Sequence, residues 1–189
     1  MKKILLVDNF DSFTYNLLHS IEKNDNVFVT VIRNDQLLEL DIAIFDKIVL
    51  SPGPGLPKEA GQLIPFIEHC FAKKPILGIC LGHQALGQFF GAQLKNLPHV
   101  LHGVQLETKI ISQKSIFKLL PQNIQTGHYH SWVLNEEDFP SSLEITAHNQ
   151  QGGIMSFVHK QYDITGIQFH PESVLTPMGD FIISQWINY

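Results

Sequence analysis

The sequence predicts an α/β fold in which a mostly parallel central sheet carries helices on both faces and continues into a small antiparallel extension. Two observations support this prediction. In the first half of the chain, short apolar runs alternate with segments of helical periodicity, which is typical of parallel strands joined by helices. In the second half, β-rich segments follow one another between polar turns. Because the 189 residues contain no repeat or linker, we expect a single domain over residues 1–189.

The first third of the chain contains three candidate strands and a helix. Residues 4–7 form a continuous apolar run, as expected for a strand buried on both faces. Asp11 or Ser12 can cap the helix that follows, and its apolar positions include Tyr15, Leu18 and Ile21. Residues 27–32 and 44–50 are the second and third candidate strands.

The next elements lead to the middle of the chain. One apolar stripe with the spacing of a helix face consists of Leu63, Phe66, Ile67, Cys70 and Phe71. Pro75 ends this helix, and residues 76–79 form a fourth buried strand. The β-rich segments of the second half are 104–111, 124–134, 143–147, 154–158 and 164–169. A final helix has an apolar face that includes Phe181, Ile182, Trp186 and Ile187.

Composition excludes several classes of protein. The chain is 44% hydrophobic with a net charge of −5, far from the composition of disordered proteins. Mild acidity without any basic run argues against nucleic acid as a ligand. No apolar run approaches the roughly 20 residues of a membrane helix, and the apolar run at the N-terminus is too short for a secretory signal. Two cysteines do not form a disulfide framework, so we expect a cytoplasmic, reducing environment.

Cys80 stands in the most informative motif, residues 78–84, which reads Gly-Ile-Cys-Leu-Gly-His-Gln. A buried strand ends at a cysteine that has a glycine two residues away on each side, and a helix begins at once. This is the pattern of a nucleophile elbow with sulfur in place of a hydroxyl group. Glycines permit the tight, strained turn, and a helix N-terminus favours the thiolate. We therefore expect Cys80 to be a nucleophile, and Cys70, on an apolar stripe, to be a core residue.

A second candidate element lies at the end of the last strand, where residues 168–172 read Gln-Phe-His-Pro-Glu. Residues two apart in an extended chain share a face, so His170 and Glu172 can point the same way. An imidazole that acts as a base needs a second group to orient its ring, and Glu172 can supply it. Zinc deaminases also contain His-x-Glu but require a later Pro-Cys-x-x-Cys. No cysteine follows position 80, which excludes that class.

The third element is the loop of residues 51–55, Ser-Pro-Gly-Pro-Gly, after the third strand. Ligands of open α/β sheets bind at the carboxyl ends of the strands. Glycines there let backbone N–H groups approach a substrate oxygen, as an oxyanion hole or a carboxylate site requires. Such a stretch is also common as an ordinary turn, and it lacks the patterns of nucleotide phosphate loops.

Together these elements resemble the class I, triad-type glutamine amidotransferases, and within them the small subunits (component II) of anthranilate synthase and of aminodeoxychorismate (para-aminobenzoate) synthase. The resemblance to this subgroup also rests on residues 8–14 (Asp-Asn-Phe-Asp-Ser-Phe-Thr), 50–55, 129–131 and 166–175, so it extends over nearly the whole chain. It implies the flavodoxin-like fold of that family. For residues 8–14 it implies no residue-level chemistry.

The resemblance implies a role for each candidate site residue. Cys80 would attack the side-chain amide of glutamine and form a thioester, and His170, oriented by Glu172, would carry the proton to the departing ammonia. Backbone N–H groups of Leu81 and Gly53 would bind the oxyanion. The implied substrate-binding residues are Gly53, Pro54, Gly55, Leu81, Gln84, Ser131 and Trp132. The chain departs from the usual pattern at His128, Val104 and residues 149–153, none of which belongs to the implied triad.

The resemblance also implies a partner, because a single domain of this size has no room for a second reaction. Ammonia would pass to a chorismate-using large subunit (component I). We favour the large subunit of anthranilate synthase, in tryptophan biosynthesis. The alternative is aminodeoxychorismate synthase, in folate biosynthesis, or one small subunit that serves both enzymes. No metal or organic cofactor is implied for this chain, although the large subunit is expected to need magnesium. Two alternatives remain open: a regulatory subunit without chemistry, and a free-standing cysteine hydrolase of γ-glutamyl compounds.

Overall fold

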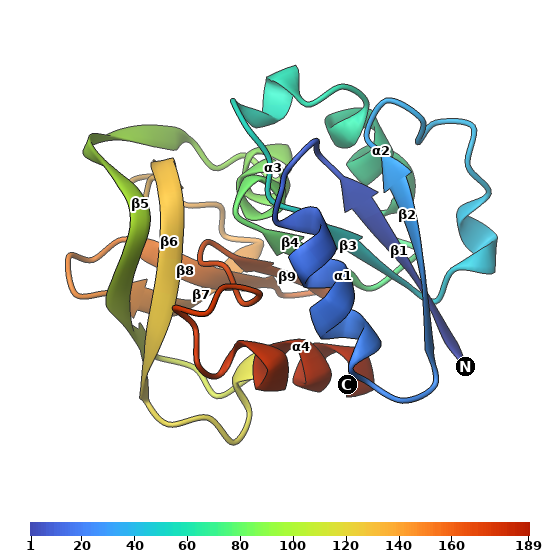
Figure 1. Cartoon of the computed structure of the whole chain (residues 1–189). Helices are drawn as coiled ribbons and strands as arrows, with labels where there is room; N and C mark the ends of the chain where they lie inside the picture. Colours follow the sequence, from blue (N-terminus) through green and yellow to red (C-terminus); the bar gives the residue numbers. More distant parts are fainter.

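The structure is a computed structural model that describes residues 1–189, and a single sheet of nine strands runs through it (Figure 1). Five strands form its parallel part, in the spatial order β2-β1-β3-β4-β9. Their bounds are β1 (Lys2–Asp8), β2 (Val27–Arg33), β3 (Lys47–Leu50), β4 (Ile76–Ile79) and β9 (Ile164–Ile167). The predicted α/β fold is thereby confirmed.

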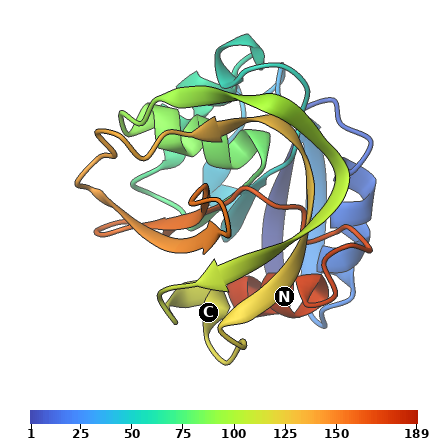
Figure 2. The same ribbon diagram turned by 90° about the vertical axis from the view of Figure 1, so that its left-hand side faces the viewer.

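The antiparallel part continues the same sheet beyond β9, in the order β9-β8-β7-β5-β6. It consists of β5 (Leu94–Ile110), β6 (Asn123–Leu134), β7 (Leu143–Asn149) and β8 (Ile154–His159). These four strands correspond to the β-rich segments 104–111, 124–134, 143–147 and 154–158, and the predicted antiparallel extension is confirmed. Figure 2 shows that β5 and β6 run side by side and curve around one side of the molecule; this pair of strands is the β5–β6 ribbon.

Helices cover both faces of the parallel strands, as predicted. One face carries α1 (Thr14–Glu22) and α4 (Gly179–Asn188), and the other carries α2 (Leu63–Cys70) and α3 (Leu81–Phe89) (Figure 1). Three short 3₁₀ helices lie in the connections: η1 (Ile42–Ile44), η2 (Pro57–Glu59) and η3 (Ser115–Phe117). None of the helices has the length and apolar character needed to cross a membrane.

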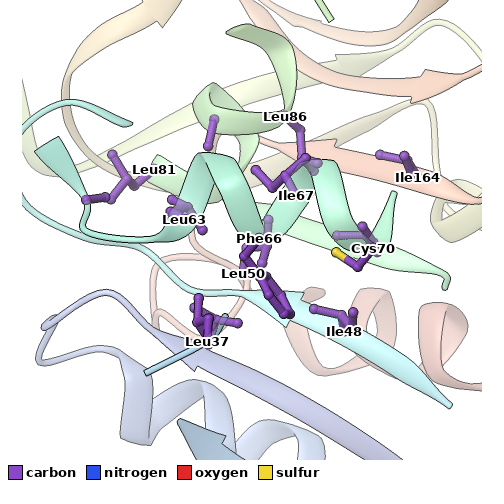
Figure 3. Close-up of a cluster of buried hydrophobic side chains, with 14 of the residues drawn as sticks. Leu37, Ile48, Leu50, Leu63, Phe66, Ile67, Cys70, Leu81, Leu86 and Ile164 are labelled. Carbon is purple, nitrogen blue, oxygen red and sulfur yellow. The ribbon is translucent and has the colours of Figure 1, made fainter. Parts of the chain in front are cut away.

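Two apolar cores, one on each face, hold these layers together. The core beneath α2 and α3 contains 22 buried residues, and Figure 3 shows Phe66 of α2 beside Leu50 of β3, and Ile67 beside Leu86 of α3. The core on the opposite face contains 21 buried residues. Cys70 is fully buried, and this burial raises the pKa of its thiol to about 12. The expectation that Cys70 is a core residue is confirmed.

The start of α1 differs from the prediction. Phe13 occupies the N-cap position, and no side chain caps the helix there. Asp11 instead bonds to the N-cap residue itself, since its Oδ1 accepts a hydrogen bond of 2.8 Å from Phe13 N. The expected apolar position Tyr15 is 60% exposed. The buried face instead consists of Thr14, Leu17, Ser20 and Ile21, since the helix starts at Thr14, which bonds to the Asp8 carboxylate.

Other boundaries shift as well. The third strand begins only at Lys47, because the Asp41 side chain caps η1 over residues 42–44 and leaves Ile44 54% exposed. In α4, Ile183 is buried whereas Phe181 is only partly buried. The last strand ends at Ile167, two residues before its expected end.

The largest difference is β5, which begins at Leu94 instead of residue 104. Its first half pairs with β6 alone and is largely exposed. A strand that is not packed on a core lacks the apolar alternation by which strands are found in a sequence.

Candidate active site

The elbow at Cys80 is the best-defined part of the site. Cys80 joins β4 to α3 and has φ +51°, a left-handed conformation that is rare for residues with a side chain. A Cβ atom on Gly82 would lie 2.4 Å from the Leu50 carbonyl oxygen, and one on Gly78 would lie 2.6 Å from Gly82. The two glycines are therefore needed for α3 to pack against the strands, and the predicted elbow is confirmed.

His170 and Glu172 lie directly after β9. The Nδ1 atom of His170 is 2.6 Å from Glu172 Oε1, and both side chains are buried. The backbone of His170 is fixed as well, because its N–H donates to Gly127 O of β6 and its carbonyl accepts from Thr176 Oγ1. Since a carboxylate can only accept, Nδ1 donates to Glu172, and Nε2, a buried atom without a hydrogen-bond partner, is the nitrogen left available for proton transfer.

Pairing of β4 with β9 brings Cys80 and His170 into one site, although 90 positions separate them. Ile79 is in register with Ile167, and Cys80 N donates to Ile167 O. Burial lowers the pKa of His170, but the nearby Cys80 sulfur and the Glu172 carboxylate outweigh it and raise that pKa to about 10. The arrangement therefore favours an imidazolium next to the sulfur.

Other buried histidines near the site behave in the opposite way. Burial lowers the pKa of His83 and of His130 to about 3, and that of His128 to about 4. These three rings are neutral at physiological pH. Among the buried histidines, His170 is distinguished by a carboxylate partner and a sulfur neighbour, which gives it the charge needed in an acid–base role.

The glycine loop packs directly on the start of α3. A Cβ atom on Gly53 would lie 2.4 Å from Leu81 Cδ2, so no side chain fits between the loop and the elbow. Pro54 and Gly55 are exposed, and Gly55 has φ +72°. The structure thus brings together Gly53 and Leu81, the two residues whose N–H groups were expected to bind an oxyanion.

The remaining predicted residues meet at β6. Gln84 is buried on α3, and its Nε2 donates to Trp132 O at 2.8 Å and to Gln168 Oε1 at 3.2 Å. Ser131 precedes Trp132 on β6. A cavity of about 230 Å³ opens there, lined by Leu56, Lys58, Gln88, Gln93, Leu94 and Trp132. Gln84 therefore holds β6 against α3, and its predicted contact with a substrate stays a prediction.

Four residues with direct contacts to the site had no predicted role. Gln168 Nε2 lies 3.7 Å from Cys80 Sγ. The rings of Phe13 and Tyr129 lie 5.1 and 4.9 Å from the His170 ring, centroid to centroid. Asn9 bonds to Ser51 at the start of the glycine loop. Phe13 and Asn9 lie in residues 8–14, a segment that carried a family resemblance without any chemical reason.

One large surface hollow lies elsewhere. It measures about 610 Å³ and lies beside Lys114, Lys160 and Tyr189, around the first residues of β9. Cys80 lies beyond the carboxyl end of the neighbouring strand β4, so this hollow is not part of the site. No group of three or more His, Cys, Asp or Glu side chains is placed to hold a metal ion.

Comparison with known proteins gives a consistent result. The family model described as glutamine amidotransferase class-I matches residues 5–188. The chain is 41% identical to anthranilate synthase component 2 of Cyanophora paradoxa, over 98% of both chains. It is 39% identical to aminodeoxychorismate synthase component 2 of Escherichia coli K12, over 98% of this chain and 99% of that protein.

Among solved structures, the fold is similar to that of a "putative gmp synthase subunit a protein" from Thermoplasma acidophilum. The TM-score is 0.88 and the sequence identity 27%, over 100% of this chain and 93% of that one. A glutamine amidotransferase of Thermotoga maritima shares the fold with a TM-score of 0.76 at 20% identity, over 99% of this chain and 81% of that one.

Proposed function

The chain belongs to the class-I glutamine amidotransferase family, and we propose that its 189 residues form a single glutaminase domain that delivers ammonia to a chorismate-using synthase subunit. Cys80, His170 and Glu172 are the proposed catalytic residues. The observation that carries this proposal is the raised pKa of His170 beside a cysteine held in a strained elbow. A buried imidazolium between a sulfur and a carboxylate is the arrangement that acyl transfer through a thioester requires.

The proposed reaction begins with the Cys80 proton on His170. The sulfur attacks the side-chain amide carbon of L-glutamine, a C–S bond forms and the carbonyl oxygen becomes an oxyanion. His170 Nε2 then gives its proton to the amide nitrogen, the C–N bond breaks and ammonia leaves. In the second half, His170 takes a proton from water as the water oxygen attacks the thioester carbon. The C–S bond then breaks, glutamate leaves, and the Cys80 thiolate and the protonated His170 are restored. Glu172 keeps the ring in one tautomer throughout.

The oxyanion is assigned to the backbone N–H groups at the place where the glycine loop meets the elbow. Gly53 and Leu81 are in contact there, and their backbone N–H groups are the proposed donors. Loss of one such donor typically costs about 3–4 kcal/mol of transition-state stabilisation. Gly55, Pro54, Gln84, Ser131 and Trp132 are proposed to surround the remainder of the glutamine molecule, beside the cavity at Trp132.

For the partner, we propose the large subunit (component I) of anthranilate synthase, with aminodeoxychorismate synthase as the alternative. Relatives named as component 2 of each enzyme are similar to this chain at 41% and 39% identity, so identity does not choose between them. The proposed location is the cytoplasm, and no cofactor is assigned to this chain. Co-purification with the large subunit, followed by identification of an ortho- or para-substituted product, decides the pathway.

The central experiment replaces the nucleophile. Cys80→Ala is expected to abolish synthesis with glutamine, by about 10³-fold or more, while the complex with the large subunit still uses ammonium salts. Cys70→Ala is the matched control, because Cys70 is the other cysteine and lies in the core.

A glutamine-derived chloroketone followed by intact mass spectrometry tests the same assignment without the partner. We expect one adduct on the wild-type chain and none on Cys80→Ala. Retention of glutamine-dependent synthesis by Cys80→Ala would show that the nucleophile is wrong. A wild-type chain without an adduct would instead support a regulatory subunit without chemistry.

A further inference from the structure

The segment of residues 8–14 between β1 and α1 is folded around one buried carboxylate. Asp8 Oδ1 accepts hydrogen bonds from Phe10 N at 3.0 Å and from Thr14 Oγ1 at 2.9 Å. These bonds close the turn at the carboxyl end of β1, the same sheet edge that carries Cys80. With its ends fixed, the segment presents Asn9 to the glycine loop and Phe13 to His170.

Asn9 is bound to the glycine loop at several points. Its backbone N–H donates to Ser51 Oγ at 3.0 Å, and its Nδ2 donates to Ser51 O at 2.9 Å. Its Oδ1 accepts from Asn34 Nδ2 at 3.0 Å, so the amide orientation is fixed from behind. A Cβ atom on Gly53 would lie 2.6 Å from Asn9 Cβ. The position of Gly53 therefore depends on Asn9.

Phe13 packs on the imidazole. Its ring is 5.1 Å from the His170 ring at an interplanar angle of 65°, and 4.8 Å from the Tyr129 ring. Tyr129 also meets His170, at 4.9 Å and 65°, and its hydroxyl group lies 3.0 Å from Ser173 Oγ. Glu172 fixes Nδ1 of the imidazole, and the two aromatic rings restrict the remaining tilt of the ring.

We propose that residues 8–14 are a positioning element for both halves of the reaction site: Asn9 places the oxyanion loop through Ser51, and Phe13 places His170. This inference rests on the proposed function, since it assigns the segment to the same reaction. Both residues act through another group: Asn9 through the glycine loop, and Phe13 through the imidazole of His170. The loop near residue 53 and the histidine at residue 170 both contact this short turn. Each is therefore held in a fixed position relative to Cys80.

Two reagents separate the two halves of this proposal on the full-length chain. Iodoacetamide alkylates Cys80 by direct displacement, so its rate reports the ionised sulfur and depends on His170 but not on an oxyanion loop. The glutamine-derived chloroketone also needs the loop, and its inactivation rate at saturation is read separately from its apparent binding constant. Intact mass on a Cys70→Ala background assigns all modification to Cys80.

For Phe13→Leu, we expect both reagents to react about tenfold more slowly at neutral pH, with binding of the chloroketone changed less than twofold. The pH profile of alkylation should move as the ion pair weakens. Phe13→Tyr keeps the ring and should restore the rates to within about twofold. Phe28→Leu, at a phenylalanine that is 53% exposed on β2, is the matched control. An unchanged alkylation profile in Phe13→Leu would overturn the assignment of Phe13.

For Asn9→Ala, we expect inactivation by the chloroketone to slow about tenfold while alkylation by iodoacetamide stays within twofold. Ser51→Ala, which removes only the hydroxyl partner, is the milder second variant if Asn9→Ala does not fold, with an expected threefold effect in the same direction. Asn16→Ala, at an exposed position on α1, is the control. Equal slowing of both reagents, or of neither, would overturn the assignment of Asn9.

Failure of this inference differs from failure of the proposed function. A wild-type chain that reacts with the chloroketone at Cys80 while both variants behave like their controls leaves the function standing and removes the positioning element. A wild-type chain that does not react with the chloroketone removes the function itself, and the inference with it.

Discussion

The parallel and antiparallel parts of the sheet are built by different rules. In the parallel part, every residue of β3, β4 and β9 is buried, as crossover helices on both faces require. In the antiparallel part, β5 has 17 residues of which only Thr108 and Ile110 are buried. Its pairing with β6 contains two irregularities, between Asn96 and Leu101 and between His102 and Val104.

The site follows this division. The parallel part supplies Cys80, the glycine loop and His170, each directly after a buried strand. The β5–β6 ribbon supplies none of the proposed catalytic groups, but its inner side contacts them: Gly127 pairs with His170, the Tyr129 ring packs on His170, and Trp132 accepts from Gln84. The proposed reacting groups therefore lie where packing fixes the backbone, whereas the ribbon closes one wall of the site through a few hydrogen bonds and one aromatic ring.

The strongest test of this difference removes a core ring from the parallel part. Phe66 is fully buried beneath α2 (Figure 3), so Phe66→Ala is expected to lower the free energy of unfolding by about 3–5 kcal/mol. Val100→Ala in the ribbon, at a residue that is 67% exposed, should change it by less than about 0.5 kcal/mol. Urea unfolding measures both. Equal losses would mean that the two parts are stabilised alike.

A glycine substitution tests whether the elbow tolerates any displacement. The Cβ atom of Gly82→Ala would meet the Leu50 carbonyl oxygen at 2.4 Å, between two fixed backbones. We expect glutamine hydrolysis to fall about 100-fold, because a shift near 1 Å at a nucleophile has effects of that size.

Gly152→Ala in the antiparallel part is the matched control for this elbow substitution. Its φ is +81° and no atom lies within 4 Å of the added carbon, so only backbone strain of about 1–2 kcal/mol is expected. Activity should stay at the wild-type level. A Gly82→Ala protein with full activity would show that α3 can move relative to β3.

The same division explains what could be predicted from the sequence. Buried strands such as β1 and β4 appear as continuous apolar runs, and the glycine frame at Cys80 marks a backbone conformation, so the elbow was predictable. The first half of β5 was missed because partner-strand hydrogen bonds define it, and these leave no pattern in a single segment. Asn9 and Phe13 were missed for a related reason: their contacts, to Ser51 and His170, are distant in the chain.

The ion pair between His170 and Glu172 makes the stability of the fold depend on pH. Burial lowers the pKa of His170, but Cys80 and Glu172 raise it to about 10, above the ordinary value of 6.5. A raised pKa in the folded state stabilises the fold fully below pH 6.5, and this contribution is lost as the pH rises toward about 10.

Glu172→Gln is therefore expected to be less stable than wild type by about 1.5–3 kcal/mol near pH 6.5, with a difference that narrows toward pH 10. Urea unfolding at several pH values measures this difference, and Glu144→Gln, at the partly exposed partner of Lys114, is the control. A difference that stays constant with pH would contradict the assigned ion pair.

The smallest expected difference concerns two lysines, one in each part. Lys47 of β3 is buried, and its Nζ donates to Trp186 O at 2.7 Å near the C-terminus of α4 and lies 4.9 Å from the Trp186 ring. Lys114 forms an ion pair of 2.8 Å with Glu144 beside the antiparallel strands, with the Lys114 side chain 61% and the Glu144 side chain 33% exposed.

We expect Lys47→Met to lower the free energy of unfolding by about 1 kcal/mol. The variant loses a charge-assisted hydrogen bond to a helix C-terminus. It also no longer buries a charge, the effect that lowers the pKa of Lys47, and this gain offsets part of the loss. Lys114→Met should cost less than about 0.5 kcal/mol, and that cost should vanish in high salt, since solvent and ions screen an exposed pair. Urea unfolding at two salt concentrations separates them. If the Lys114 variant loses stability and the Lys47 variant does not, burial does not determine which of the two lysine contacts stabilises the fold.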